Sequence, residues 1–233
     1  MGSDVLLGAA CGRMAPSSVF FDDFYRVKLP TTNSARMRAT SASISQNMNA
    51  IIMTALQAGF DYIVYVDDDL RFEPDFVTRL LSHGKDRVAP LVCQRIPPFQ
   101  PFTFKGWTEQ KGFEYLVLTA EHQGLIRVPM FAGMPGLIAT KIFRKLSWPY
   151  FPENIYREDG SWLQADLQFS KKLYDAGVET WCDLDCVAQH TGQFHVSTVF
   201  DAETQSWRPN LNFVETFTKS ATLEEAVLQG VRR

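Results

Sequence analysis

The chain has 233 residues, of which 45% are hydrophobic and 21% are charged. That balance is typical of a globular protein and excludes disorder, collagen-like repeats and coiled coil. The formal net charge is −3, from 23 basic and 26 acidic residues, so the totals do not indicate the basic face that sequence-independent nucleic-acid binding needs.

The length predicts a single domain followed by a tail, and we expect a domain over residues 1–200 with a tail over 201–233 that packs on it. No stretch reaches the ~20 apolar residues of a membrane span, and the first residues lack the pattern of a signal peptide. Four cysteines are too few for a disulfide scaffold, so we expect reduced thiols in a cytoplasmic protein.

The first 92 residues alternate between apolar strands and helices, which is the order of an α/β sheet. Apolar residues from Ile44 to Leu56 follow helical spacing, and Gly59 is expected to end that helix. The run Asp61–Val66 is almost continuously apolar, as in a central strand that is covered on both faces. In chain order we expect a strand at 5–10, a loop at 11–33, a helix between 44 and 59, a strand at 61–66, a short helix between 74 and 84, and a strand at 87–92.

The second half is more irregular, because a proline- and aromatic-rich stretch at 94–107 cannot form a regular helix or a central strand. A second irregular loop, rich in Trp and Tyr, covers 148–162. Around these loops we expect strands near 113–119 and 125–132, a turn at 133–136, a short helix at 141–146, a helix at 163–176 ended by Gly177, a strand from Val178, and a short helix opened by Thr222 and Glu225.

Three consecutive aspartates, Asp67–Asp69, follow the predicted strand at 61–66 directly. Ligand sites in open α/β sheets lie at the carboxyl ends of strands. In an extended chain Asp67 and Asp69 point the same way, and two carboxylates on one side repel each other unless a hard divalent cation lies between them. A solvated acidic turn is the alternative. The position directly after an apolar strand favours the metal site, with a diphosphate supplying the remaining ligands.

Two more residues are candidates for chemistry, although neither identifies a site alone. Asp166 falls in the first turn of the helix predicted at 163–176, where a carboxylate also complements the helix dipole. His190 follows the strand that begins at Val178, and a lone histidine there is more often a hydrogen-bonded structural residue than a ligand.

Together these features resemble the small single-domain glycosyltransferases with the GT-A fold, of the type found in phages and related bacterial sequences. The similarity covers roughly residues 4–195 and lies in the helix–strand–Asp-x-Asp unit from Asn47 to Leu70, the turn and helix from Gly136 to Leu146, and the segment from Trp162 to Gly192. The resemblance implies a mixed α/β sheet flanked by helices. It also implies transfer of a sugar from a nucleotide-sugar, which we expect to be a UDP-sugar, to an acceptor hydroxyl.

The resemblance assigns roles to individual residues. Asp69 and His190 would coordinate Mn²⁺ or Mg²⁺, and Asp67 would face both the ribose and the metal ion. Asp166 matches the general base that takes the proton of the acceptor hydroxyl, which implies a single displacement with inversion. The expected nucleotide-sugar contacts are Ala9 and Ala10 beside the base, Gly136 beside the donor sugar, and Arg38, Asn47, Asp67 and Asp68.

The sequence departs from the family pattern at two positions. Ala165 stands where the family has a glutamate before the base, and Gln46–Asn47 stands where the family commonly has Arg-Asn. The contact that the family's arginine makes with the nucleobase must therefore be made by another residue, and Arg36 and Arg38 are the candidates.

Three other interpretations stay open. Cys182, Cys186 and His190 are spaced by four, which on a helix would form a zinc-binding face, whereas a strand would spread them over ~26 Å. A nucleotidyltransferase shares the sheet and the metal chemistry, but the loop after the first strand matches that class poorly. A binding module that has kept the fold and lost turnover is favoured only by Ala165.

The acceptor is left open between a glycan, a protein and a hydroxymethylated pyrimidine in phage DNA, in the cytoplasm of a bacterial or phage-infected host cell. The net charge of −3 weighs against DNA. We expect the two irregular loops to form the acceptor surface, because aromatic rings stack on sugar rings and on nucleobases. The aromatic residues concerned are Trp107, Trp148, Tyr150, Tyr156 and Trp162.

Overall fold

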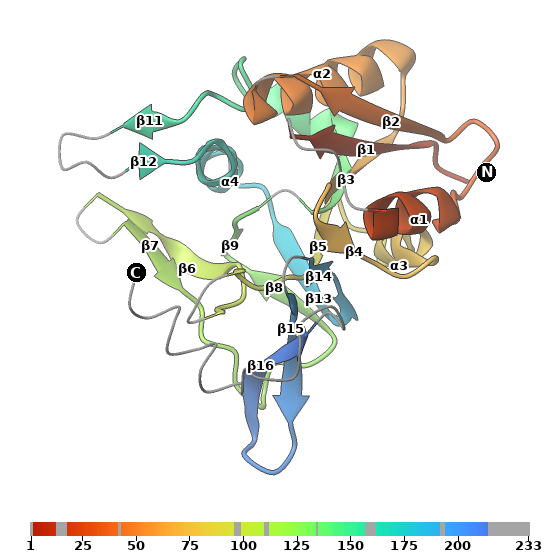
Figure 1. The fold of residues 1–233 in the computed structure, drawn as a ribbon. Helices are drawn as coiled ribbons and strands as arrows, with labels where there is room; N and C mark the ends of the chain where they lie inside the picture. Colours follow the sequence, from red (N-terminus) through yellow and green to blue (C-terminus); the bar gives the residue numbers. More distant parts are fainter. Residues whose placement is uncertain are drawn as a thin grey trace.

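The computed structural model describes residues 2–12, 18–41, 43–95, 99–109, 112–133, 135–156, 162–191 and 194–213 (Figure 1). These residues form a seven-stranded mixed sheet with helices on both faces, together with three smaller sheets. None of the helices in this described part of the chain is long and apolar enough to cross a bilayer.

The central sheet has the strand order β2-β1-β3-β10-β5-β13-β8. β1 is parallel to β2 and β3, and β13 is parallel to β5, while β10 runs antiparallel between β3 and β5 and β8 runs antiparallel at the edge. The carboxyl ends of β1, β3 and β5 therefore lie along one edge of the sheet. The strands are β1 (Val5–Cys11), β2 (Ala35–Thr40), β3 (Tyr62–Asp67), β5 (Arg87–Leu91), β8 (Leu125–Val128), β10 (Gly136–Ala139) and β13 (Thr180–Val187).

Helices cover both faces of this sheet (Figure 1). α2 begins after Ser43, whose hydroxyl accepts a hydrogen bond from the backbone N of Gln46, and ends at Gly59 with φ 76°. The side chains of α2, η1 and α4 pack against one face, and those of α1 and α3 pack against the other. The helices are α1 (Ser18–Arg26), α2 (Ile44–Ala58), α3 (Phe76–Ser82), the 3₁₀ helix η1 (Thr140–Lys145) and α4 (Ala165–Asp175).

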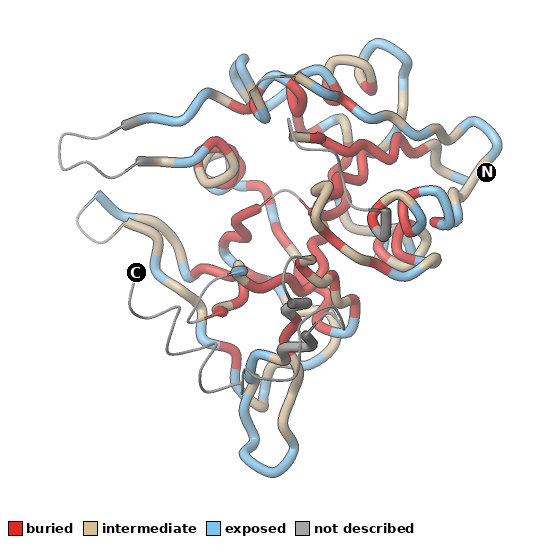
Figure 2. Tube along the Cα trace, viewed as in Figure 1, coloured by how far each residue is buried: buried red, intermediate tan, exposed pale blue. Residues whose placement is uncertain are grey.

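Alternation along β1 shows how the two helix layers share the sheet. Val5 and Leu7 pack into the cluster formed with α1 and α3, whereas Leu6 and Ala10 pack into the cluster formed with α2. All seven residues of β1 are buried, as expected for a strand covered on both faces (Figure 2). The core thus lies on both sides of the sheet and leaves the strand ends as the place for a site.

Three smaller sheets extend from the central one. The sheet β16-β15-β14-β4 starts directly after β3, because β4 follows the aspartates at the end of that strand. The other two are β7-β6-β9 and the hairpin β11-β12. Their strands are β4 (Leu70–Arg71), β6 (Thr103–Thr108), β7 (Gly112–Tyr115), β9 (Met130–Phe131), β11 (Ile155–Tyr156), β12 (Trp162–Leu163), β14 (Gln189–His190), β15 (Phe194–Asp201) and β16 (Ser206–Phe213).

The expected mixed sheet flanked by helices is confirmed, but the loop expected at 11–33 is wrong over part of its length. α1 lies within that range, where Phe20 and Phe24 pack four residues apart against the sheet. Only nine residues form this helix, so its apolar spacing is too short to stand out from a loop.

The C-terminal segment begins in a β-hairpin that the sequence did not predict. Strands β15 and β16 pair from Phe194 with Phe213 to Asp201 with Ser206, so the boundary expected at residue 200 falls inside a hairpin. The pairing buries backbone groups of both strands, which joins the start of the expected tail to the residues before it. The helix predicted at Thr222 lies outside the described residues.

Candidate functional site

The acidic triplet Asp67–Asp69 lies at the carboxyl edge of the central sheet. In the register of β1 with β3, Ala10 pairs with Asp67. On the other side of β3, Gly136 begins β10 and pairs with Tyr65. The chain leaves β3 between these two strands, and the three aspartates are only partly buried. Their side chains are therefore available at the place where α/β sheets bind ligands.

Asp68 and Asp69 have partners on different sides of this turn. One oxygen of the Asp68 carboxylate accepts a hydrogen bond of 2.8 Å from the backbone N of Gly12, which ties the triplet to the end of β1. The backbone carbonyl of Asp69 accepts hydrogen bonds from the backbone N and the hydroxyl of Thr191, at 2.6 and 2.9 Å. The Asp69 carboxylate forms an ion pair with Arg95.

His190 lies beside Asp69 because β14 pairs with β4, which places His190 opposite Leu70. The Nδ1 atom of His190 lies 2.7 Å from the carbonyl oxygen of Cys93. A carbonyl only accepts, so we assign the proton to Nδ1, and Nε2 then keeps its lone pair. Metal-ligating histidines are commonly oriented in this way. Burial lowers the pKa of His190, against the opposing effect of Asp69, and so favours the neutral ring that a ligand needs.

Asp166 reaches the same edge from the first turn of α4. Phe169 and Leu173 of this helix are buried in the core cluster formed with α2, which fixes the helix against the sheet. Asp166 accepts a hydrogen bond of 2.8 Å from the backbone N of Leu167. Its charge acts on Asp67, so the two carboxylates lie near each other.

A short strap, residues 151–154, holds the start of α4 and was not predicted. The side chain of Asn154 accepts a hydrogen bond of 2.9 Å from the backbone N of Ala165, and Gln168 donates to the carbonyl of Glu153 at 2.8 Å. On its other side the strap contacts α2, where Asn49 forms hydrogen bonds with the backbone of Phe151. The strap thus joins the N-terminal halves of α2 and α4, and the sequence signal for it is only a Pro-Glu-Asn stretch in an irregular loop.

The electrostatics of the edge are unfavourable for four free carboxylates. The pKa of Asp67 is raised well above its ordinary value, first by burial and then by the charges of Asp69, Asp166 and Asp68. Burial also raises the pKa of Asp166 and of Asp68, the latter against the hydrogen bond from Gly12. Carboxylates in this arrangement gain most from a cation.

The donor set fits a hard divalent cation with few protein ligands. Asp69 offers a carboxylate, and His190 offers Nε2 once Nδ1 donates to Cys93. Within the residues that the structure describes, no three His, Cys, Asp or Glu side chains are gathered as a complete metal site. An ion held by Asp69 and His190 would therefore complete its coordination with ligands from a bound substrate, which Mg²⁺ commonly does with phosphate oxygens.

The remaining predicted contacts have structural partners of their own. Ala9 and Ala10 are buried within β1, and Asn47 donates to the carbonyl of Cys11 at 2.9 Å. A Cβ at Gly136 would lie 2.4 Å from the carbonyl oxygen of Val88, so a glycine is needed where β10 approaches β5. What these four residues do toward a nucleotide-sugar stays a prediction.

Arg36 and Arg38, the two candidates for contact with the nucleobase, differ in how far their side chains are already bonded. Arg36 donates to backbone carbonyls at the end of α1, including that of Phe24 at 3.0 Å, and so caps that helix. Arg38 is exposed on β2, with its guanidinium 4.8 Å from the ring centre of Phe21. Of the two, Arg38 has the side chain that is less engaged with the backbone.

The aromatic residues of the two stretches expected to be irregular loops are mostly packed, and the first of these stretches runs into strand β6. Trp107 lies under Lys171 of α4 at 4.4 Å, and Tyr150 packs edge to face on Phe143. Trp148 is 60% exposed, which makes it the aromatic side chain best placed for stacking among those described. The side chains of Tyr156 and Trp162 lie outside the described part of the structure.

The zinc interpretation is not supported by the positions of its cysteines. Cys182 and Cys186 lie in strand β13 and are buried in the core, where burial raises the pKa of both thiols. A zinc ligand must be a thiolate, which this environment disfavours. The strand pattern after Gly177 thus predicts this segment correctly.

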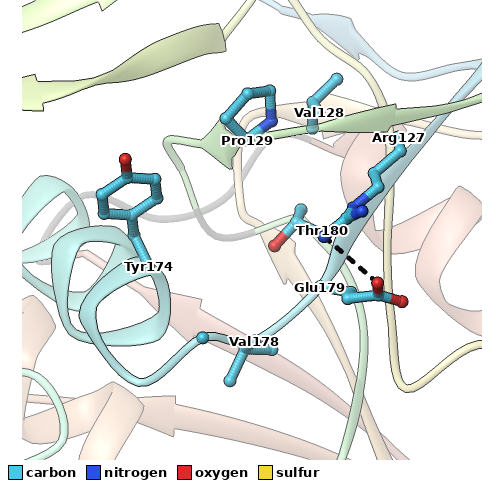
Figure 3. Close-up of a pocket in the computed structure, with 8 residues that line it drawn as sticks. Arg127, Val128, Pro129, Tyr174, Val178, Glu179 and Thr180 are labelled. Carbon is cyan, nitrogen blue, oxygen red and sulfur yellow. Dashed lines mark ion pairs between the residues drawn. The ribbon is translucent and has the colours of Figure 1, made fainter.

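A cavity of about 380 Å³ lies at the other end of β13, between the end of α4 and β8 (Figure 3). Val178 and Thr180 line it at the start of the strand, and Arg127 and Glu179 form an ion pair of 3.2 Å at its border. Asp67–Asp69, Asp166 and His190 are called the acidic edge from here on. Because His190 follows the opposite end of β13, this cavity is separate from the acidic edge.

Comparison with known proteins supports the fold. No family model and no curated protein matches the sequence. The crystal structure of A197 from STIV, whose fold is of the GT-A type, is similar over 94% of this chain and 100% of its own, with 13% identity and a TM-score of 0.54. The fold is of the GT-A type. Crystal structures of TarS from S. aureus align over 78% of this chain with TM-scores of 0.48 and 0.46 and identities of 12% and 11%, and this chain covers 35% and 60% of them.

Proposed function

We propose that the protein is a glycosyltransferase that binds a nucleotide-sugar, a UDP-sugar by preference, with Mn²⁺ or Mg²⁺ and transfers the sugar to an acceptor hydroxyl with inversion. The observation that carries this proposal is the position of Asp67, Asp69, His190 and Asp166 at one edge of a GT-A sheet. With a cation bound by Asp69 and His190, such an edge would combine a metal ion with a separate carboxylate, which are the two groups that sugar transfer from a diphosphate requires.

The chain's own residues would divide the chemistry. Asp69 and His190 would hold the metal ion, which when bound stabilises the negative charge that develops on the leaving diphosphate. Asp166 would accept the proton of the attacking hydroxyl. Burial raises the pKa of Asp166 toward the range in which a carboxylate is an effective base, and the strap at Asn154 holds its helix in place.

The partners and the location are part of the proposal. We propose a glycan, a protein or a hydroxymethylated pyrimidine of DNA as acceptor, in the cytoplasm of a bacterial or phage-infected cell. The exposed ring of Trp148 supports an acceptor with a sugar or base ring, which a glycan and DNA offer and an unmodified protein does not. The hairpin β15–β16 supports one domain that includes the first part of the expected tail.

Ala165 favours a second candidate, a module that binds a nucleotide-sugar and does not transfer the sugar. Ala165 is buried at the start of α4, next to Asp166. In the resembled family this position carries a glutamate, so one carboxylate of the reacting site is absent here. The two candidates agree on donor binding and differ in turnover.

The first test is calorimetric binding of UDP, with GDP and CMP alongside, in the presence and absence of Mn²⁺. We expect the wild type to bind UDP in the presence of Mn²⁺. The Asp69→Ala variant should not bind it, because the Asp69 carboxylate is a proposed metal ligand. Asp61→Ala, which changes an exposed aspartate at the other end of β3, is the matched control and should bind like the wild type. A folded wild type that binds none of the nucleotides would overturn the proposal.

A further inference from the structure

We propose that Arg95 is a donor-binding residue that pairs with Asp69 in the donor-free protein and moves to the diphosphate when a metal ion takes that carboxylate. This inference rests on the proposed function, because it needs a metal ion and a diphosphate at the acidic edge. It adds a residue that neither the acidic motif nor the family resemblance assigns.

Arg95 lies on a segment that is part of the acidic edge. The chain continues from the end of β5 through Cys93, whose carbonyl orients His190, to Arg95 two residues later. The backbone N of Gln94 donates to the carbonyl of Gln100 at 2.9 Å, which holds this segment in position. The backbone at Arg95 is therefore held beside the proposed metal ligands.

The charge of Arg95 acts on the whole acidic edge. Its guanidinium pairs with Asp69 and also favours the ionised forms of Asp67 and Asp68. The same positive charge disfavours a proton on His190. A divalent cation at Asp69 and His190 would meet the same repulsion, so Arg95 and the cation oppose each other at this carboxylate.

The structure gives Arg95 the freedom to leave Asp69. Its side chain is 63% exposed, whereas the Asp69 side chain is 25% exposed, so the guanidinium lies on the solvent side of the pair. Once a cation neutralises Asp69, a diphosphate at the same edge offers a new anion within reach of the long side chain. The planar guanidinium matches phosphate oxygens in a two-bond geometry, which an ammonium group cannot reproduce.

The proposal predicts opposite changes in two affinities when Arg95 is replaced: tighter binding of Mn²⁺ and weaker binding of UDP. Calorimetry would measure the affinity for Mn²⁺ alone and the affinity for UDP at saturating Mn²⁺, in wild type, Arg95→Ala and Arg95→Lys. Arg127→Ala is the matched control, because Arg127 is also 63% exposed and its ion pair with Glu179 lies at the separate cavity (Figure 3).

We expect Arg95→Ala to bind Mn²⁺ about 2- to 5-fold more tightly, the range of an exposed ion pair. We expect the same variant to bind UDP with Mn²⁺ about 10- to 100-fold more weakly, because a charged hydrogen bond to phosphate is lost. Arg95→Lys should fall between wild type and Arg95→Ala for UDP, and Arg127→Ala should match the wild type in both measurements.

Unchanged or equally weakened binding of both ligands in Arg95→Ala would overturn the inference while leaving the proposed function intact. A wild type that binds Mn²⁺ but none of UDP, GDP and CMP would overturn the proposed function, and the role of Arg95 with it. Because Arg95 is exposed and makes a surface ion pair, its replacement should leave the thermal unfolding midpoint within a few degrees of the wild type.

Discussion

Asp166 has an environment that differs from that of the other acidic residues at the sheet edge. It lies in the first turn of a helix, and the backbone N of Leu167 donates to it. Burial nevertheless raises its pKa, because desolvation outweighs these backbone contacts. Asp69 has a cationic partner in Arg95, whereas no described ion pair involves Asp166.

Asp166→Asn should therefore separate donor binding from transfer. The amide keeps the size of the side chain and cannot take a proton, so we expect UDP affinity with Mn²⁺ to stay unchanged and sugar transfer to fall by about 10²- to 10⁴-fold. Transfer would be followed with an acceptor that the wild type glycosylates, or as hydrolysis of the UDP-sugar.

The control for this substitution is Asp175→Asn at the other end of α4, where the carboxylate pairs with Lys171 on the surface. We expect that variant to transfer sugar like the wild type. Full transfer by Asp166→Asn would show that another group acts as the base.

Residues with a distinctive position could be found from the sequence, and residues that act through backbone contacts could not. Asp67–Asp69 stand at the end of an apolar run, and His190 ends a strand. Asn154 and Thr191 form hydrogen bonds between side chain and backbone across long stretches of chain, and such bonds leave no periodic pattern. Arg95 lies in a proline-rich loop whose path cannot be deduced from composition.

At the scale of elements, a buried ionic cluster fixes α3 to β13. The carboxylate of Asp183, 1% exposed, accepts hydrogen bonds of 2.8 and 3.0 Å from Arg79 and lies 2.7 Å from Nε2 of His83. Burial by itself would raise the pKa of Asp183, but the hydrogen bonds from Arg79 and His83 outweigh it, and the pKa is lowered. The ionised carboxylate therefore stabilises the contact between this helix and the sheet.

Asp183→Asn should destabilise the protein, and the loss should depend on pH. Losing the charged hydrogen bonds to Arg79, whose side chain is 36% exposed, costs about 2 kcal/mol, which we expect at pH 7. The folded-state pKa lies below the unfolded value of about 3.9, so the stabilisation is present above that pH and disappears as the pH falls through the lower folded-state value. Urea unfolding should show that the wild type and the variant differ less in free energy of unfolding near pH 3 than at pH 7.

Glu179→Gln, which changes an exposed ion pair just before β13, serves as the control and should cost less than about 1 kcal/mol at either pH. An Asp183→Asn variant as stable as the wild type at pH 7 would mean that the cluster contributes nothing to the α3–β13 contact.

Elements were predictable where their apolar pattern was long, and their directions were not. The run Asp61–Val66 predicts a central strand because both faces must be buried, and β3 confirms it. Such a run carries no information on whether its neighbour is parallel, so the antiparallel insertion of β10 between β3 and β5 had to come from the structure. α1 was missed because nine residues give too few repeats of the helical period.

The whole molecule keeps its cysteines out of contact with solvent. Exposure is 6% or less for all four cysteines, which belong to or adjoin strands of the central sheet. Burial raises the pKa of each thiol, to about 11 for Cys93 and about 12 for Cys186. Because the thiolate is the reactive form, both access and ionisation protect them.

We therefore expect no rapid reaction of the native protein with Ellman's reagent at pH 8, and reaction of all four thiols after denaturation in guanidinium chloride. The native reaction should be limited by opening of the fold and should accelerate in step with denaturant. A thiol that reacts within seconds under native conditions would contradict the burial of the strand that carries it.

The general architecture followed from the sequence because the two helix layers and the buried strands each have a clear hydrophobic pattern. The hairpin that spans the boundary expected at residue 200 did not follow from the sequence, for a different reason. β15 and β16 pair with each other along their length, and the pairing of two half-exposed strands depends on the turn at 202–205 rather than on hydrophobicity. Hairpins of this kind are visible in the fold and weakly marked in the sequence.

The position of β10 determines the order in which the nascent chain can complete the central sheet. β10 lies between β3 and β5, yet the ribosome makes it after both. β1, β2 and β3 can pair as soon as they emerge, whereas β5 has no neighbour in the sheet until β10 and β13 follow. The three aspartates thus appear early in synthesis, and Asp166 and His190 join them only after most of the fold has been translated. A chain released before His190 would carry the acidic edge without its histidine.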